Sequence, residues 1–452
     1  MKYRILALLL AAVLLLTACG QAAPMDTPAG PLAQAQYPEM APYPDEMSYL
    51  NEETGEFDSE GFDRAYTAWR ESRQNQYNQP QGYADGLETF FSDCLPAFLT
   101  AGEGENRVCS PLNVYMALAM LAEVTGGDSR QQILTLLGAK NLAALRTQAE
   151  HVWNAHYCDD GANTCVLANS LWLEEGMAYD PDPTQALAAL YHASSFQGDL
   201  GSEEMNGMLR DWLNEQTGGL LEEQVQNVAM DPQTILALAS TIYYRAKWSN
   251  EFWEENNTEA PFHSPDGDIT VTYMNSTMNY GPYFWGEDFS AVSLPLEDGS
   301  SMWLVLPDEG KTPADLLSSG HAMALALGEP GSYENQKSLR VNLSLPKFDV
   351  AADLRLNDAL KTLGIRDAFD PSAADFTPIL PEDDCWLDTV SHAARVAIDE
   401  EGVTAAAYTV MLMCGSAMPP QEEIDFVLDR PFLFVITSRD NLPLFAGAVN
   451  RP

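Results

Sequence analysis

The sequence predicts an α+β fold, with helices in its first half and strands in its second. Apolar side chains recur every three or four residues over 112–124, which is the period of a buried helix face. Runs rich in β-branched and aromatic residues occur later, at 234–244, 301–306, 339–348 and 432–436. Strands and helices do not alternate along the chain, which argues against a doubly wound parallel sheet.

The helices are predicted from apolar spacing and from end signals. The apolar stripe of the 112–124 helix comprises Leu112, Tyr115, Met116, Ala119, Met120 and Val124, and Gly126-Gly127 closes it. Further helices are expected at 131–137, 184–193 and 205–213. Thr184 would serve as the N-cap of its helix, because a Thr hydroxyl can accept a hydrogen bond from a free backbone N–H of the first turn.

The charge balance of the chain excludes several classes of partner. Its 452 residues include 23 Lys plus Arg and 66 Asp plus Glu, a formal net charge of −43. Non-specific binding to nucleic acid or to an anionic membrane needs a basic surface, so neither is expected. A hydrophobic fraction of 46% excludes a disordered acidic tail protein and provides material for a large core.

The first nineteen residues have the pattern of an export signal. Lys2 and Arg4 give a positive start, an apolar run covers 5–16, and small residues precede Cys19. The ending Leu-Thr-Ala-Cys resembles the bacterial lipoprotein signal, in which the cysteine is lipidated and becomes the first mature residue. An ordinary signal peptide and an uncleaved anchor are the alternatives. The expectation is a bacterial, extracellular protein that touches the membrane only through a lipid on Cys19.

Three segments are predicted along the chain. Residues 1–18 are the signal peptide, and residues 19–86 are a lipidated, acidic tether rich in Pro and Gln. Within the tether, aromatic residues at helical spacing favour a short helix over 61–73. Residues 87–452 contain no second linker and are predicted to form one domain.

A search for catalytic motifs gives little. The chain has no Gly-rich phosphate loop, no HExxH sequence and no GxSxG sequence. His151, His156, Cys158 and Cys165 lie close together in the sequence, but their spacing matches no common zinc site. We therefore predict no metal and no cofactor. A disulfide between the two cysteines and a pair of free thiols both stay open.

The C-terminal third carries a string that resembles the reactive-loop hinge of the serpins. The hinge string is Asp399-Glu400-Glu401-Gly402-Val403-Thr404-Ala405-Ala406-Ala407. Other segments resemble serpins in the same order along the chain, and with the hinge they cover about 87–452. They include Val108-Cys109-Ser110-Pro111-Leu112, Ala168-Asn169-Ser170-Leu171-Trp172, Leu345-Pro346-Lys347-Phe348, Asp429-Arg430-Pro431-Phe432-Leu433-Phe434 and Leu444-Phe445-Ala446-Gly447. Each motif alone is weak, whereas the ordered set is specific.

The resemblance to serpins implies a monomer with one large domain of three β-sheets, eight or nine helices and an exposed bait loop. In this family a serine protease attacks the loop and forms an acyl-enzyme. The loop then inserts as a new strand into the central sheet, and the protease is carried to the far pole and distorted. The chain is therefore expected to be a suicide inhibitor and not an enzyme. A non-inhibitory serpin that acts as a binding module is the alternative.

The hinge sequence suits such an insertion. Side chains alternate between the two faces of a strand, so every second residue would face the core. Counted from Val403, the inward set is Val403, Ala405, Ala407 and Thr409, and the outward set is Thr404, Ala406, Tyr408 and Val410. No inward residue is charged or large. Gly402 precedes the strand at the point where the hinge needs backbone freedom.

The fixed hinge length of the family implies cleavage between Ser416 and Ala417. Ser416 is small and uncharged, which suits the shallow pocket of elastase-like or subtilisin-like proteases better than a deep acidic or a large apolar pocket. Cleavage between Met413 and Cys414 is the runner-up. Papain-like cysteine proteases are an alternative class of target.

The resemblance also implies residues that control opening of the central sheet. At the end of the sheet next to the hinge, which we call its top, Lys347 and Glu400 are expected to form a partly buried ion pair that holds the hinge. The alternative is two surface charges, whose pairing contributes under about 1 kcal/mol.

A polar cluster is expected at the middle of the sheet. Ser110 and His392 match the family pattern there. Asn113 stands where serpins usually have Ser, and Ser240 stands where they usually have Asn. We expect these two residues to exchange roles within one hydrogen-bond cluster.

Overall fold

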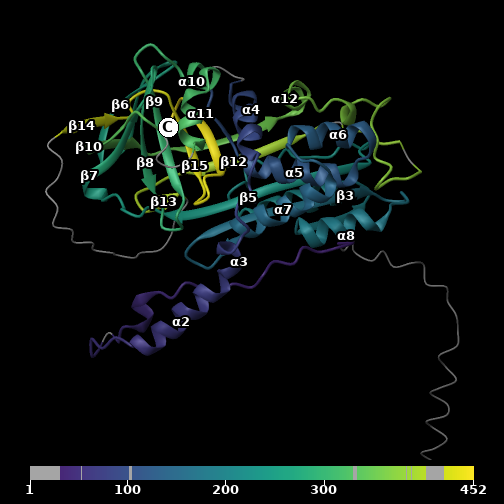
Figure 1. The fold of residues 1–452 in the computed structure, drawn as a ribbon, viewed down its shortest axis with the longest axis horizontal. Coiled ribbons are helices and arrows are strands. Elements are labelled where there is room, and N and C mark those ends of the chain that lie inside the picture. The colour runs from purple at the N-terminus through teal and green to yellow at the C-terminus, as the bar shows by residue number, and fades with distance from the viewer. Residues whose placement is uncertain are drawn as a thin grey trace, which may run out of the picture.

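A computed structural model describes residues 31–51, 53–100, 104–328, 333–382, 384–387, 389–403 and 422–452. Its sheets and helices pack into one body, from which helix α2 (Ser59–Ser72) projects (Figure 1). No helix in these ranges is both long and apolar enough to cross a bilayer.

The strands form sheets of nine, five and two strands. The nine-stranded sheet contains β1 (Arg107–Cys109), β6 (Thr258–Ser264), β7 (Gly267–Trp285), β8 (Phe289–Pro295), β9 (Ser301–Pro307), β10 (Gln336–Pro346), β14 (Glu423–Val427), β15 (Phe432–Thr437) and β16 (Pro443–Val449). The five-stranded sheet contains β2 (Cys158–Asp159), β3 (Thr164–Glu174), β4 (Ala193–Gly198), β5 (Leu236–Lys247) and β13 (Gly402–Val403). The two-stranded sheet pairs β11 (Asp349–Arg355) with β12 (Ser391–Ala397).

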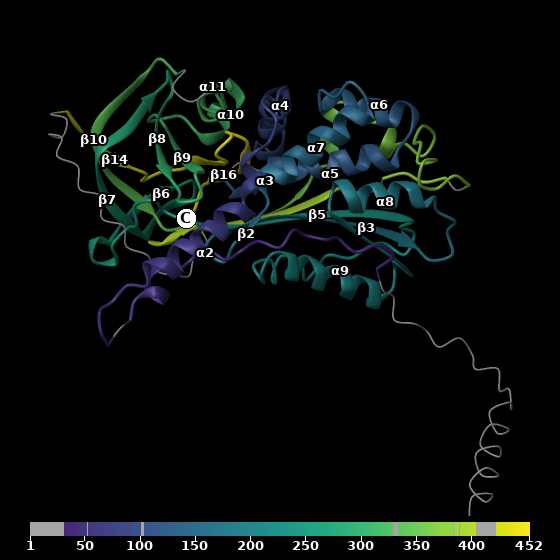
Figure 2. The same ribbon diagram turned by 60° about the horizontal axis from the view of Figure 1, so that its bottom comes forward.

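Eleven α-helices occur in the described residues, and nine of them follow residue 86. Besides α2 they are α3 (Gln74–Tyr77), α4 (Leu87–Leu99), α5 (Pro111–Val124), α6 (Gly127–Leu136), α7 (Leu142–His156), α8 (Pro181–Leu190), α9 (Glu203–Gln216), α10 (Pro313–Ser319), α11 (His321–Leu327) and α12 (Asn357–Thr362). Short 3-10 helices cover Glu46–Tyr49, Glu254–Asn256 and Asp367–Phe369. Helices α5 to α8 lie over one face of the five-stranded sheet and α9 lies against the other (Figure 2). The predicted α+β fold with three sheets is confirmed.

Helix α5 begins and ends where its sequence signals predict. Ser110 is the N-cap, and its hydroxyl accepts a hydrogen bond from the Asn113 N–H. Pro111 follows at the first helical position, where its missing N–H and fixed φ cost nothing. Every residue of the predicted apolar stripe is buried, so this helix forms the centre of the core beneath the sheets.

The predicted N-cap at Thr184 is wrong. Helix α8 begins three residues earlier, at Pro181, and Asp180 caps it by accepting a hydrogen bond from the Asp182 N–H. Thr184 lies inside the first turn and donates its hydroxyl hydrogen to the Pro181 carbonyl. An Asp-Pro pair is the stronger start signal, because it combines an acidic cap with a proline at the first helical position.

Two parts of the N-terminal segment (residues 31–86), around residues 31–43 and 69–73, lie against the body, although they precede the predicted domain. The first residues of the segment extend the edge of the five-stranded sheet: the Leu32 N–H donates to the Ser195 carbonyl at 2.6 Å, and the Ser195 N–H donates to Ala33 at 2.7 Å. Farther along, the Tyr37 ring stacks on Trp153, with 5.9 Å between ring centroids. The segment therefore covers the edge strand β4, which otherwise exposes unpaired backbone groups.

A buried ion pair fixes the other end of this segment. Arg73 and Asp160 lie 3.5 Å apart, and their side chains are 4% and 0% exposed. The Asp160 carboxylate also accepts a hydrogen bond from the Trp69 indole N–H at 2.9 Å, and its backbone carbonyl accepts one from Tyr43. Asp160 lies in the turn between β2 and β3, so the pair holds the junction of α2 and α3 on the five-stranded sheet.

Candidate functional site: the hinge and the open edges of the central sheet

The five-stranded and two-stranded sheets lie edge to edge, with β5 at one of the neighbouring edges and β12 at the other. We call them together the central sheet. Strands β5 and β12 are close enough to contact, but within the described residues no strand pairing joins them. Each strand therefore presents backbone donors and acceptors along the side that faces the other. Such facing edges can accept a further strand by β-augmentation.

The hinge already occupies the top of this gap as strand β13. Gly402 and Val403 pair antiparallel with Lys247 and Ala246 at the end of β5. Val403 also forms a bridge to Ile398, directly after β12, so β13 lies between the two facing edges. The Val403 side chain is 2% exposed.

Gly402 is required here by close approach and not only by hinge freedom. A Cβ atom on this residue would lie 2.3 Å from the Ala246 carbonyl oxygen and 2.8 Å from the Lys247 Cα. Both neighbours are backbone atoms of β5, which cannot move aside without breaking their own strand pairing. Only glycine lets the hinge approach β5 closely enough to begin a strand.

Glu400 is held at the top of the sheet by two side-chain donors. Lys347 Nζ lies 2.5 Å from Glu400 Oε1, and the side chains are 34% and 11% exposed. The Asn257 amide donates to the same oxygen at 2.5 Å. Burial raises the pKa of Glu400, but the hydrogen bonds from Lys347 and Asn257 outweigh it and bring the pKa below its ordinary value. The carboxylate is therefore ionised at neutral pH.

The chain that follows β5 also binds the hinge backbone. The Trp248 N–H donates to the Glu401 carbonyl at 3.0 Å, and the Phe252 N–H donates to Glu400 at 2.9 Å. The Trp248 indole N–H donates to the Asp399 carbonyl at 2.8 Å. The Trp248 and Phe252 rings contact edge to face, with centroids 5.9 Å apart. The residues before β13 are thus fixed on one side by a preformed surface.

A second polar cluster joins helix α5 to both halves of the central sheet. The Ser110 N–H donates to His392 Nε2 on β12 at 2.9 Å. On the other side, Ser240 on β5 donates its hydroxyl hydrogen to an oxygen of Asn113 at 2.5 Å, or of Asn169 at 2.8 Å. The start of α5 therefore contacts β5 and β12 together, at the level where a new strand must pass. Asn113 and Ser240, the two departures from the family pattern, lie in this one cluster.

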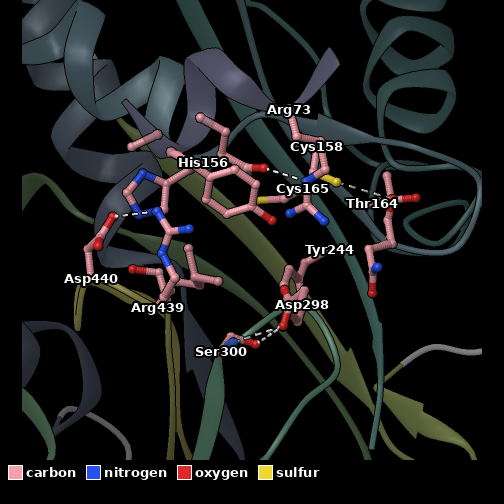
Figure 3. Close-up of a pocket in the computed structure, with 16 residues that line it drawn as sticks. Arg73, His156, Cys158, Thr164, Cys165, Tyr244, Asp298, Ser300, Arg439 and Asp440 are labelled. Carbon is pink, nitrogen blue, oxygen red and sulfur yellow. Dashed lines mark hydrogen bonds and ion pairs between the residues drawn. The ribbon is translucent and has the colours of Figure 1, made fainter. Parts of the chain in front are cut away.

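The His and Cys residues considered as metal ligands do not form such a site. His156, Cys158 and Cys165 line one pocket between α3, α7 and the β2–β3 hairpin (Figure 3). His151 lies outside this pocket and bonds Gln79. Within the described ranges, no group of three or more His, Cys, Asp or Glu residues is placed to hold a metal ion. Cys158 and Cys165 are opposite in register and have free thiols, and burial raises the pKa of both.

Comparison with known families decides the identity of this architecture. The model of the family described as "Serpin (serine protease inhibitor)" matches residues 86–452. The chain belongs to the serpin family. Serpin-ZX of Arabidopsis thaliana is 27% identical over 375 residues, which cover 78% of this serpin and 94% of the relative. The leukocyte elastase inhibitor of Sus scrofa is 28% identical over 372 residues, covering 80% and 97%.

Solved structures share the fold of this serpin. The thermophilic serpin tengpin in its native state superposes with a TM-score of 0.73 at 23% identity, covering 83% of this chain and 95% of that one. AtSerpin1 of Arabidopsis, in its native stressed conformation, gives a TM-score of 0.70 at 25% identity, covering 82% and 99%.

The bait of the serpin lies outside the described residues. This applies to the predicted bond between Ser416 and Ala417, to hinge residues Thr404, Ala405, Ala406 and Ala407, and to the predicted lipidation residue Cys19. The hinge residues Glu400 to Val403 and the five predicted gate residues are described. Sequence reasoning missed the role of Asn257, which is 143 residues from Glu400 and has no local pattern that links it to the hinge.

Neutralising Glu400 is expected to loosen the hinge. Glu400→Gln removes the charge that faces Lys347 and keeps the volume of the side chain. Because Glu400 is mostly buried and Lys347 is one-third exposed, we expect a loss of about 1 kcal/mol and faster spontaneous loss of inhibitory capacity. The thermal midpoint measures the loss of stability, and the half-life of inhibitory activity at 37 °C measures the rate of spontaneous inactivation. The control is Asp349→Asn, which breaks a more exposed pair with Arg395. Equal effects in the two variants would contradict a special role for Glu400.

His392 is expected to make the stability of the serpin depend on pH. Burial lowers the pKa of His392 to about 4, against 6.5 for a free side chain. A group whose pKa falls on folding stabilises the protein above its unfolded pKa and loses that contribution as pH drops through the folded pKa. We expect up to about 3 kcal/mol to be lost between pH 7 and pH 4.

Thermal midpoints measured from pH 7 to pH 4 test this dependence. The variant His392→Gln should show a shallower decline than the wild type, whereas His321→Gln, at an exposed position, should follow the wild-type curve. Parallel curves for all three proteins would show that His392 does not carry the effect.

Proposed function

We propose that this serpin is an exported, membrane-tethered suicide inhibitor of serine endopeptidases that cleave after small residues. The observation that carries the proposal is the unpaired edge between β5 and β12, with the hinge strand β13 already begun at its top. A loop that continues from Val403 has a place to add as a strand, and its predicted inward residues are small and uncharged.

The proposed inhibitory step begins at the bond between Ser416 and Ala417. The serine hydroxyl oxygen of the protease attacks the carbonyl carbon of Ser416, and the bond to the Ala417 nitrogen breaks as that nitrogen takes up a proton. The protease stays joined to Ser416 by an ester. The released segment from Val403 to Ser416 is fourteen residues long and spans about 46 Å as a strand, so its insertion carries the protease most of the way along the central sheet.

Two observations support a target with a shallow specificity pocket. Ser416 has a small, neutral side chain, and the residues from Val403 to Pro420 contain no charge. One relative, 28% identical, is a leukocyte elastase inhibitor. Elastase-like or subtilisin-like proteases are therefore the proposed partners.

The proposed anchor is the lipid on Cys19. Eleven residues separate Cys19 from Pro31, where the described chain begins to lie along β4. A fully extended chain of this length spans at most about 40 Å, so the body would stay close to the membrane. Lipidation is tested by labelling with a fatty-acid analogue in a bacterial host, where Cys19→Ala should abolish the label.

A protease panel tests inhibition. Incubation with an elastase, a subtilisin, a trypsin and a papain should give an SDS-stable band at the summed masses with the first two, and mass spectrometry should place the cut after Ser416. Cleavage without a complex by every protease would contradict the proposal and favour a binding module. A stable complex with papain alone would favour a cysteine protease as target.

A further inference from the structure

Trp253 is an exposed aromatic residue beside the hinge. Its side chain is 63% exposed, the largest fraction among the large apolar side chains of the described residues. An indole left in water at this position gains free energy if a partner covers it, and tryptophan is among the residues that most often dominate protein interfaces.

The turn that carries Trp253 is fixed to Glu400 at both of its ends. On one side, the Phe252 N–H donates to the Glu400 carbonyl at 2.9 Å. On the other, the Asn257 amide donates to the Glu400 carboxylate at 2.5 Å. The Asn256 N–H closes the turn by donating to the Trp253 carbonyl at 2.9 Å. The backbone of such a preformed turn loses little conformational entropy on binding.

The place of the turn indicates which partner would cover it. The chain leaves the described structure after Val403 and re-enters at Glu422, just before β14, so the bait begins three residues after Glu400. Strands β13 and β14 lie at the same end of the molecule (Figure 1). The Trp253 turn is tied to Glu400, so it lies at the end of the molecule from which the bait leaves, and a protease bound to the bait would approach that end.

The charges around Trp253 restrict the partner further. Glu251, Glu254 and Glu255 lie within two residues of it, and the last two are exposed. Residues 248–310 contain twelve Asp or Glu and no Lys or Arg. Lys347 also reaches this turn, but its charge is paired with the Glu400 carboxylate. In this negative field, the Trp253 ring favours a partner that presents a Lys or Arg side chain, through cation–π and Coulomb attraction.

We infer that Trp253, with Glu254 and Glu255, is a second contact surface for the target protease, and that it selects proteases with Lys or Arg on the surface that borders the active-site cleft. This inference rests on the proposed function and deepens it. The small residue Ser416 admits many proteases of similar specificity, and the contact at Trp253 distinguishes among them by their charge.

Binding to an inactive protease tests the inference apart from trapping. The probe is an elastase-like protease with a basic cleft border whose catalytic serine is replaced by alanine. We expect Trp253→Ser to raise the Kd at least tenfold and Trp253→Phe to raise it less. The double variant Glu254→Gln with Glu255→Gln should make the Kd depend less on salt concentration. The control is Trp386→Ser, at a 44% exposed residue on the chain that enters β12 at the end away from the hinge.

The outcomes separate the two proposals. An unchanged Kd for Trp253→Ser, or an equal loss for Trp386→Ser, overturns the inference, as does a wild-type chain that does not bind the inactive protease. The wild-type chain could instead bind the inactive protease through Trp253 but give no SDS-stable complex with the active protease. That result would support the contact surface and contradict the proposed inhibition. An acidic protease of the same cleavage specificity should show no dependence on Trp253.

Discussion

Replacing Ala405 or Ala407 with Arg is expected to turn the serpin from an inhibitor into a substrate. Val403 is buried at the top of the gap, so the residues two and four positions later would face the core of the central sheet after insertion. An unpaired guanidinium buried there costs several kcal/mol and slows insertion relative to hydrolysis of the acyl-enzyme. We expect the SDS-stable fraction to fall at least tenfold while the cleavage site stays the same.

Ala406→Arg is the matched control, because its side chain should face outward. It should leave most of the complex intact. If complex formation persists in the Ala405 and Ala407 variants but is lost in the Ala406 variant, the register is shifted by one residue. Persistence in all three would argue against insertion as a strand.

Arg73→Ala is expected to be the most destabilising of the substitutions outside the bait. It leaves the fully buried Asp160 carboxylate without its guanidinium, and removing one member of a buried ion pair costs about 3 kcal/mol or more. The hydrogen bond from Trp69 remains and keeps the loss near the lower end of that range. The thermal midpoint of unfolding measures it.

Arg210→Ala is the control for this loss, because it removes an ion pair with Glu203 that is largely in solvent. It should cost well under about 1 kcal/mol. The double variant Arg73→Met with Asp160→Asn should recover part of the lost stability, because it also removes the buried, unpaired negative charge of Asp160. Should Arg73→Ala cost no more than Arg210→Ala, the N-terminal segment would contribute little to the stability of the body.

The fold was predictable because its signals are local. Ser110 and Pro111 mark the start of α5, and a stripe of apolar residues gives its buried face. The hinge string Asp399 to Ala407 resembles that of the serpins. Lys347 and Glu400 could be named as a pair only through the resemblance, since 53 positions separate them in the sequence.

The features that could not be predicted depend on single contacts between distant residues. Arg73 meets Asp160 across 87 positions, and Tyr37 stacks on Trp153 from a segment without any apolar period. The steric need for Gly402 also comes from another strand, because the Ala246 carbonyl is what excludes a Cβ atom. Patterns of spacing report on a segment and its own burial, and they carry no information about which remote side chain it will meet.

The course of the N-terminal segment has a consequence for where a captured protease would end. Residues 31–35 lie along β4 near α8, at the end of the molecule opposite β13 and β14 (Figure 1). Under the proposed mechanism, insertion carries the protease from the hinge end to that same pole. If Cys19 carries the proposed lipid, no more than about 40 Å from Pro31, the arrested enzyme would lie between the inhibitor and the bilayer. Capture would then remove the protease from the surrounding fluid and hold it against the surface of the cell.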